Sequence, residues 1–219
     1  MSDSALGASD LRTRRSKAAL VRAVGELLDS GDTRPSITNV VALAGTSRPT
    51  FYQHFGDVAA LQRAAAHEEL DLVFAQIDPI DLTGPRWEAA LQDLMTLVVE
   101  RIDQRRDFFA SVMAGPAAFD VLSDTVAIVA DRIIARSPSV AASGSSGSPG
   151  SPGSPAAADV SRFLAAGTVW LLLDWVGRAG AEPATESAAE VAFLNTQLLL
   201  VGLAFLDAGQ TQTLGKALS

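Results

Sequence analysis

The chain has 219 residues, and its 48% of apolar residues are enough for a packed core and too many for a disordered protein. It contains no cysteine, which excludes disulfides, thiolate metal sites and cysteine nucleophiles. With only two histidines as well, we expect no metal and no cofactor. The opening residues MSDSALGASD lack the basic and apolar segments of an export signal, so we expect a cytoplasmic protein.

The net charge of −8 is spread unevenly along the chain. Residues 1–66 carry eight Lys and Arg against six Asp and Glu, whereas residues 67–219 carry nine against nineteen. The segment LRTRRSKAALVR gathers five basic residues and no acidic one. This distribution is typical of a small basic module that meets phosphates, joined to an acidic body that does not. The alternative interpretation is that this basic segment is only the solvent-exposed start of a helix.

Apolar residues recur at helical spacing throughout the chain and strand signals are nearly absent, which predicts an all-α protein. Capping and breaking residues divide the pattern into segments. In chain order, we expect a flexible tail over 1–11, a helix ending at 29–31, short helices over 37–43 and 47–54, a helix from 58 to 77, helices that begin near 85 and near 118, and two last helices over 159–178 and 186–207.

The segment 137–158 contains Gly-Ser-Pro three times in tandem and predicts a flexible loop. The last two helices that follow it are apolar on almost every side and therefore need cover. A membrane is one possible cover, but Arg162 and Asp174 interrupt the first helix, and the second is short and contains Asn195 and Gln197. We expect a homodimer that pairs these two helices with their counterparts, and no membrane contact.

The stretch AGTSRPTFYQHFGD, residues 44–57, joins the two short helices through a turn at Gly45. Glycine permits the left-handed backbone that lets the second helix cross the first steeply. Apolar residues of the pair face inward: Ile37, Val40, Val41, Ala44 and Phe51. Polar or exposed residues face outward: Arg48, Pro49, Thr50, Tyr52 and His54. This arrangement predicts a helix-turn-helix, whose second helix fits the major groove of DNA.

The segment RTRRSKAALVRAVGELL…SITNVVALAGTSRPTFYQHFGDVAAL resembles the DNA-binding domain of tetracycline-repressor-type (TetR-like) bacterial regulators over about residues 12–66. Its most specific part is AGTSRPTFYQHF; the remainder of the chain is similar in architecture only. The resemblance implies a three-helix DNA-binding domain over 12–57, a larger helical ligand-binding and dimerisation domain over 58–208, and a C-terminal tail over 209–219. It also implies a repressor that a small molecule releases from a near-palindromic operator.

The resemblance implies a role for each matching residue. Arg48 would read a base, since arginine to guanine is the commonest specific contact, and Pro49 would touch the groove wall or a thymine methyl. Phosphate or other backbone contacts would come from Ser36, Thr38, Thr46, Ser47, Thr50, Tyr52, His54 and Lys17. The chain departs from the family at FGDVAAL, because Val58 stands where members commonly have the lysine of Phe-x-x-Lys-Glu-Glu-Leu.

Bulky apolar residues in the second domain predict an apolar or aromatic effector. The candidate lining residues are Trp87, Met95, Phe108, Phe109, Met113, Phe119, Trp170, Asp174 and Trp175. For each aromatic residue and methionine among them, the alternative to a ligand-binding role is packing in the core. The carboxylate of Asp174 stands among apolar residues in the sequence and therefore needs a partner. That partner would be a cationic effector, Arg178 one turn on, or a residue across the dimer.

No catalytic motif of the nucleotide-binding, serine-hydrolase or zinc-protease kinds is present, so we expect no enzyme. The alternative interpretation is a helical protein with a vestigial helix-turn-helix, which acts as an interaction module, a small-molecule-binding protein or an enzyme.

Overall fold

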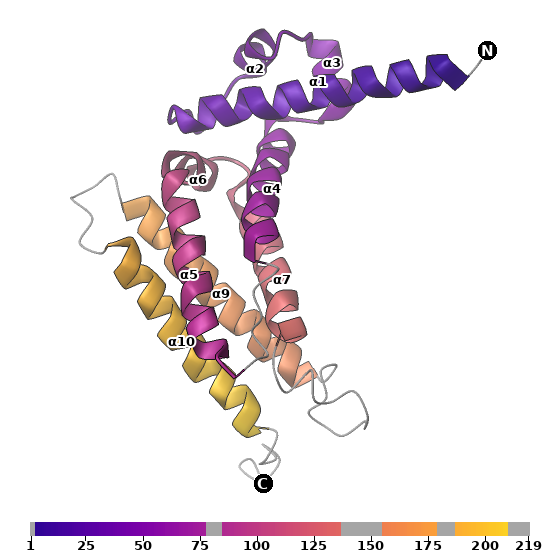
Figure 1. Ribbon diagram of the computed structural model, residues 1–219. Coiled ribbons are helices and arrows are strands. Elements are labelled where there is room, and N and C mark those ends of the chain that lie inside the picture. Colours follow the sequence, from indigo (N-terminus) through magenta and orange to yellow (C-terminus); the bar gives the residue numbers. More distant parts are fainter. Residues whose placement is uncertain (1–2, 78–84, 137–154, 179–186, 210–219) are drawn as a thin grey trace. The chain divides into compact units, whose positions relative to one another are not determined.

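The computed structural model describes residues 3–77, 85–136, 155–178 and 187–209. These residues form nine α-helices and no strand (Figure 1). The helices are α1 (Asp3–Asp29), α2 (Ile37–Leu43), α3 (Arg48–His54), α4 (Val58–Ile77), α5 (Trp87–Gln104), α6 (Arg106–Ala114), α7 (Ala118–Arg136), α9 (Pro155–Arg178) and α10 (Ala188–Gly209). The all-α prediction is therefore confirmed. The expected C-terminal tail from 210 onward and most of the Gly-Ser-Pro loop lie outside the described residues.

Two helices begin earlier than the sequence predicts. α1 starts at Asp3, which corrects the expectation of a flexible tail over residues 1–11. α9 starts at Pro155, inside the expected loop, because a proline in the first turn has an N–H that no helical hydrogen bond would use.

The chain folds into two compact units, one of residues 1–73 and 105–121 and the other of residues 74–104 and 122–219. The two units divide within α4, between Val73 and Phe74, whereas the domain boundary expected from the sequence follows residue 57. α6 also belongs to the first unit, although it follows α5 of the second unit in the chain.

The first unit has α1 as its central helix. α1 packs on α2, α3 and α6 and buries Leu20, Val24 and Leu28 completely. Val40 of α2 and Phe51 of α3 are also fully buried. These positions are the ones that the helical spacing of apolar residues predicts.

Both ends of α6 are attached to the first unit by specific contacts. At its start, the Arg105 guanidinium pairs with Asp29 of α1 at 3.3 Å and Glu69 of α4 at 3.1 Å. At its end, Gly115 lies against the Thr33 carbonyl oxygen, and the buried Gln62 side chain donates to that same oxygen at 3.2 Å. These contacts join residues far apart in sequence, so they explain why α6 groups with the N-terminal helices.

We predict that Gly115→Ala destabilises the protein, because the added Cβ would lie 2.8 Å from the backbone oxygen of Thr33. The expected loss in the free energy of unfolding is about 1–3 kcal/mol, measured by urea unfolding. Gly25→Ala in α1 is the matched control, since nothing lies within 4 Å of its added Cβ. That variant should be neutral or more stable, because alanine favours a helix over glycine by up to about 1 kcal/mol. Equal stability of the two variants would contradict the packing at Gly115.

In the second unit, α10 lies beside both α5 and α9 (Figure 1). Leu91 and Met95 of α5, Trp175 of α9 and Val191 of α10 are buried in this packing. The α10 side chain of Asn195 is also buried and donates to the Val191 carbonyl at 3.0 Å, so its amide nitrogen is satisfied within the helix.

A capping box starts α10. The Ser187 backbone N–H donates to the Glu190 carboxylate at 2.7 Å, and the Glu190 N–H donates to the Ser187 hydroxyl at 3.3 Å. The bonds from the Ser187 backbone and then its side chain lower the pKa of Glu190. A lowered pKa in the folded chain means that this carboxylate stabilises the helix start at neutral pH and that the contribution is lost as the pH falls through the lowered value.

Within the described residues, the segment Ala158–Arg178 is long and apolar enough to cross a membrane, and α6 with most of α7, bent by 117°, would add a second candidate if counted as one span. The core helices of soluble proteins pass the same test of length and composition, so this finding is weak support for a membrane protein.

Candidate nucleic-acid interface

The α2–turn–α3 segment is built from the local signals that the sequence contains. The Asn39 N–H donates to the Ser36 hydroxyl at 3.1 Å, and the Thr50 N–H donates to the Ser47 hydroxyl at 3.3 Å. Ser36 and Ser47 are thus the N-caps of the two helices. Gly45 lies between them with a φ of 62°, in the left-handed region that the sequence predicts for it.

We predict that Gly45→Ala destabilises the turn by roughly 1–2 kcal/mol, because a Cβ disfavours left-handed backbone even where space is free. Gly56→Ala is the control, since its backbone is not left-handed and nothing lies within 4 Å of its added Cβ. Thermal unfolding of both variants measures the difference. A Gly45→Ala protein as stable as Gly56→Ala would show that the turn does not need this conformation.

α3 separates apolar and polar side chains onto opposite faces. Phe51 is fully buried, whereas Tyr52 is 59% exposed, with its ring edge-on to that of Phe51 at 5.4 Å between centroids. Arg48, Pro49 and Gln53 are exposed as well, and Thr50 and His54 are half-buried. The outward face expected from the sequence is therefore accessible, with one more polar residue, Gln53, than expected.

Two side-chain contacts tie the exposed face to its neighbours. Arg48 Nη2 donates to the Thr38 hydroxyl at 2.6 Å, which ties the guanidinium at the start of α3 to the first turn of α2. His54 Nε2 lies 2.7 Å from the Ser16 hydroxyl of α1. Ser16 was not among the expected site residues, because nothing local marks a partner 38 positions away in sequence.

The remaining predicted interface residues differ in their placement. Ser36 and Ser47 are exposed, and their hydroxyls serve the helix caps. The Thr46 hydroxyl is buried, and no hydrogen-bond partner for it lies among the described residues, so Thr46 does not present its hydroxyl at the surface with the others. Val58 is half-buried at the first position of α4, just after Asp57, whose carboxylate accepts the Ala60 N–H at 2.8 Å.

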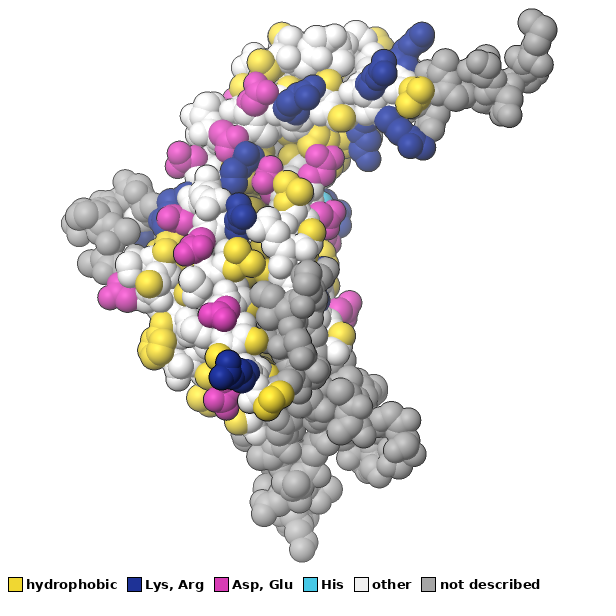
Figure 2. Space-filling model, viewed as in Figure 1, with side chains coloured by type: hydrophobic (Ala, Val, Ile, Leu, Met, Phe, Trp, Pro, Cys, Tyr) yellow, Lys and Arg dark blue, Asp and Glu magenta, His cyan; other side chains and the backbone are white. Residues whose placement is uncertain are grey.

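Basic side chains lie along the middle of α1 (Figure 2). Lys17 is exposed, as are the arginines at 12, 14, 15 and 22. The contact between Ser16 and His54 places this part of α1 next to the end of α3. The first unit therefore presents cations, hydroxyls and one phenol around a short exposed helix, which is the set of groups that contacts phosphates and base edges.

The residues expected to bind an effector do not share one environment. Phe108 and Phe109 are buried in the first unit, and Met95 and Trp175 are buried in the second. Trp87 and Met113 are half-buried. Phe119 is 77% and Trp170 62% exposed, and Asp174 is exposed and pairs with Arg178, one of the partners considered for it. These side chains therefore do not come together to form the expected pocket through any contact described above.

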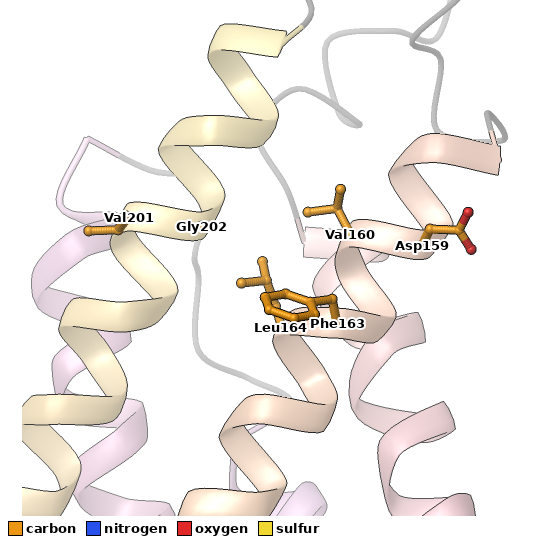
Figure 3. A pocket seen from close by; sticks show the side chains of 6 residues that line it. All are labelled: Asp159, Val160, Phe163, Leu164, Val201 and Gly202. Carbon is orange, nitrogen blue, oxygen red and sulfur yellow. The ribbon is translucent and has the colours of Figure 1, made fainter. Parts of the chain in front are cut away.

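A groove of about 440 Å³ lies between α9 and α10 and includes none of these residues (Figure 3). It is lined by Asp159, Val160, Phe163, Leu164, Val201 and Gly202. A Cβ at Gly202 would overlap the side chain of Leu164, so the glycine allows the two helices to approach closely here. Among the described residues, no group of three or more His, Cys, Asp or Glu could hold a metal ion.

No model of a known protein family matches the chain, and no curated protein matches it at a significant level.

Proposed function

We propose that the protein is a sequence-specific DNA-binding transcriptional regulator of the TetR-like kind, with α2 and α3 as a helix-turn-helix. The observation that supports this most strongly is the division of α3, which buries Phe51 and exposes Arg48, Pro49, Tyr52 and Gln53. A helix this short cannot be stable by itself, so the packing of Phe51 fixes it while its other face stays available for the major groove.

In this proposal the residues of the interface have different roles. Arg48 reads a base, Pro49 contacts the groove wall or a thymine methyl, and Tyr52, Thr50 and His54 bind phosphates. Lys17 and the neighbouring arginines add sequence-independent attraction to phosphates and make the affinity depend on salt. The lysine that family members carry at position 58 is absent, which lowers the expected non-specific affinity.

The functional unit in this proposal is a homodimer formed through α9 and α10. Large apolar side chains are exposed on both helices, among them Trp170 at 62% and Val201 at 70%, and such surfaces usually mark an interaction site. Two recognition helices related by a two-fold axis enter major grooves roughly one or more helical turns apart, so the operator is near-palindromic.

We predict that Arg48→Ala reduces discrimination between operators more than general affinity. A well-placed arginine–guanine contact contributes about 1–3 kcal/mol of discrimination, which is roughly 5- to 150-fold. Selection of bound genomic fragments by the purified protein gives the operator, and titrations of that operator and of point-substituted versions give the ratio. Arg101→Ala on α5, in the other unit, is the charge-matched control and should leave both quantities unchanged.

Tyr52→Phe tests the phosphate role, because it removes one hydroxyl from an exposed ring and leaves the packing against Phe51 in place. The expected result is a similar loss of affinity on every DNA sequence. A preferred sequence that survives Arg48→Ala unchanged would refute the assignment of Arg48, and a folded wild-type protein that binds no DNA at low salt would refute the proposed function. That second result would favour the alternative of an interaction module, a small-molecule-binding protein or an enzyme.

The proposed regulator is a repressor that an apolar or aromatic small molecule releases from DNA. The buried aromatic residues of both units are compatible with an apolar ligand, but they do not identify its binding site. A thermal-shift screen against the wild-type protein tests it, since a ligand that binds the folded state raises the unfolding temperature. A true effector must also weaken operator binding at the same concentration.

A further inference from the structure

His54, the last residue of α3, is held by a side chain of α1. Its Nε2 atom lies 2.7 Å from the Ser16 hydroxyl, and this contact joins residues 38 positions apart in sequence. The same hydroxyl lies 3.0 Å from the carbonyl oxygen of Thr13, one turn earlier in α1. Ser16 and His54 are both half-buried. The serine hydroxyl therefore has two partners, one a carbonyl oxygen and the other a ring nitrogen.

These two contacts determine which ring nitrogen of His54 carries the proton. A serine hydroxyl has one proton to donate and two lone pairs with which to accept. The Thr13 carbonyl oxygen can only accept, so both contacts are hydrogen bonds when the hydroxyl donates to Thr13 and accepts from the Nε2–H of His54. If the hydroxyl donated to His54 instead, its contact with Thr13 would lack a proton. The pair of contacts therefore favours the tautomer with its proton on Nε2.

The other ring nitrogen, Nδ1, points away from Ser16. No hydrogen-bond partner of Nδ1 lies among the residues that the structure describes. In the neutral ring with its proton on Nε2, Nδ1 has only a lone pair and cannot donate to a phosphate oxygen, which is itself an acceptor. In the imidazolium both nitrogens donate, and the ring is positively charged. The contact with Ser16 is kept in either state, because Nε2 carries a proton in both.

We propose that Ser16 is a positioning residue for DNA binding, which holds His54 with Nδ1 directed at a DNA phosphate and makes that contact depend on a second proton on the ring. The inference rests on the proposed function, in which His54 binds a phosphate, and it adds the protonation state in which His54 does so. Histidine changes charge between about pH 5 and 8, so the dependence falls near neutral pH. DNA binding then takes up one proton at each His54.

The charged groups on the neighbouring elements fit this role. α3 packs on α1 and α2, and α2 has no charged residue. Between residues 11 and 25, α1 has no carboxylate, and its charged side chains are Arg12, Arg14, Arg15, Lys17 and Arg22. On α3 itself, Arg48 and Tyr52 are the other titratable residues.

The nearest carboxylate in sequence is that of Asp57, just beyond α3, and it already accepts the Ala60 N–H at 2.8 Å at the start of α4. A DNA phosphate would therefore supply the negative charge beside the ring. An opposite charge nearby favours the charged form of a titratable group, so the phosphate stabilises the second proton.

The protonation of the ring is measured without DNA. Nitrogen-15 NMR distinguishes a proton on Nε2 from one on Nδ1, and the chain has only two histidines, so His67→Gln identifies the signals of His54. At about pH 8.5, where an ordinary imidazole is neutral, the proton should be on Nε2 and should exchange slowly with water. Ser16→Ala should abolish the slow exchange, because it removes the acceptor of that proton.

The dependence on the second proton is measured with the selected operator duplex, by titrations between about pH 6 and 8.5 at constant ionic strength. The affinity of the wild type should fall as the pH rises, by up to about tenfold per pH unit for each His54 that takes up a proton. His54→Gln should depend on pH much less steeply, because an amide donates without a second proton.

Variants of Ser16 separate positioning from folding. Ser16→Ala frees the neutral ring to turn its one N–H toward a phosphate, so the affinity should depend on pH less steeply than in the wild type. Ser16→Thr retains a hydroxyl and should restore the wild-type slope. Alanine favours a helix more than serine does, so Ser16→Ala should stay folded, which circular dichroism checks. His67→Gln on α4 is the control and should keep the wild-type slope, since Ser16 contacts the other histidine.

Two results would overturn the inference. One is a neutral His54 ring with its proton on Nδ1. The other is operator binding with the same pH dependence in the wild type, Ser16→Ala and His54→Gln; the operator is still bound in that case, so the proposed function stands. Absence of DNA binding at every pH would refute the proposed function, and with it the phosphate contact of His54, whatever the NMR result.

Discussion

The arrangement of the first unit depends on the burial of Phe51. α3 has only seven residues, and a helix of this length gains too few hydrogen bonds to offset the cost of ordering its backbone. The buried ring holds the helix against α1 and α2, and the caps at Ser47 and Ser36 satisfy the first N–H groups of each short helix. The polar residues of α3 can remain at the surface because the helix is anchored by the buried ring of Phe51.

Local signals in the sequence predicted this region closely. The N-cap Ser36, the left-handed Gly45 and the burial of Val40 and Phe51 all follow from residue type and spacing within a few positions, whereas Ser47, expected as the first helical residue, is the N-cap of α3. The start of α1 was missed because the sequence there is compatible with both a tail and a helix. Propensity alone decides such cases poorly.

Contacts between distant residues could not be predicted in the same way. The attachment of α6 to the first unit depends on Arg105 meeting Asp29 and Glu69, and on the fit of Gly115 against Thr33, and no periodicity encodes these pairs. The candidate effector residues show a related limit. Trp170 sits at helical spacing among apolar residues, so its sequence context does not reveal that it faces outward.

In the DNA-binding regulator that we propose, the contact of Arg48 with Thr38 bears on how the preferred target sequence could change. A guanidinium already oriented by a neighbouring hydroxyl loses less side-chain freedom when it meets a base, so part of the cost of recognition is met while the chain folds. The identity of residue 38, on a helix that need not enter the groove, then influences the direction in which the arginine points. A new target sequence could arise by a change in α2 that leaves every residue of α3 as it was.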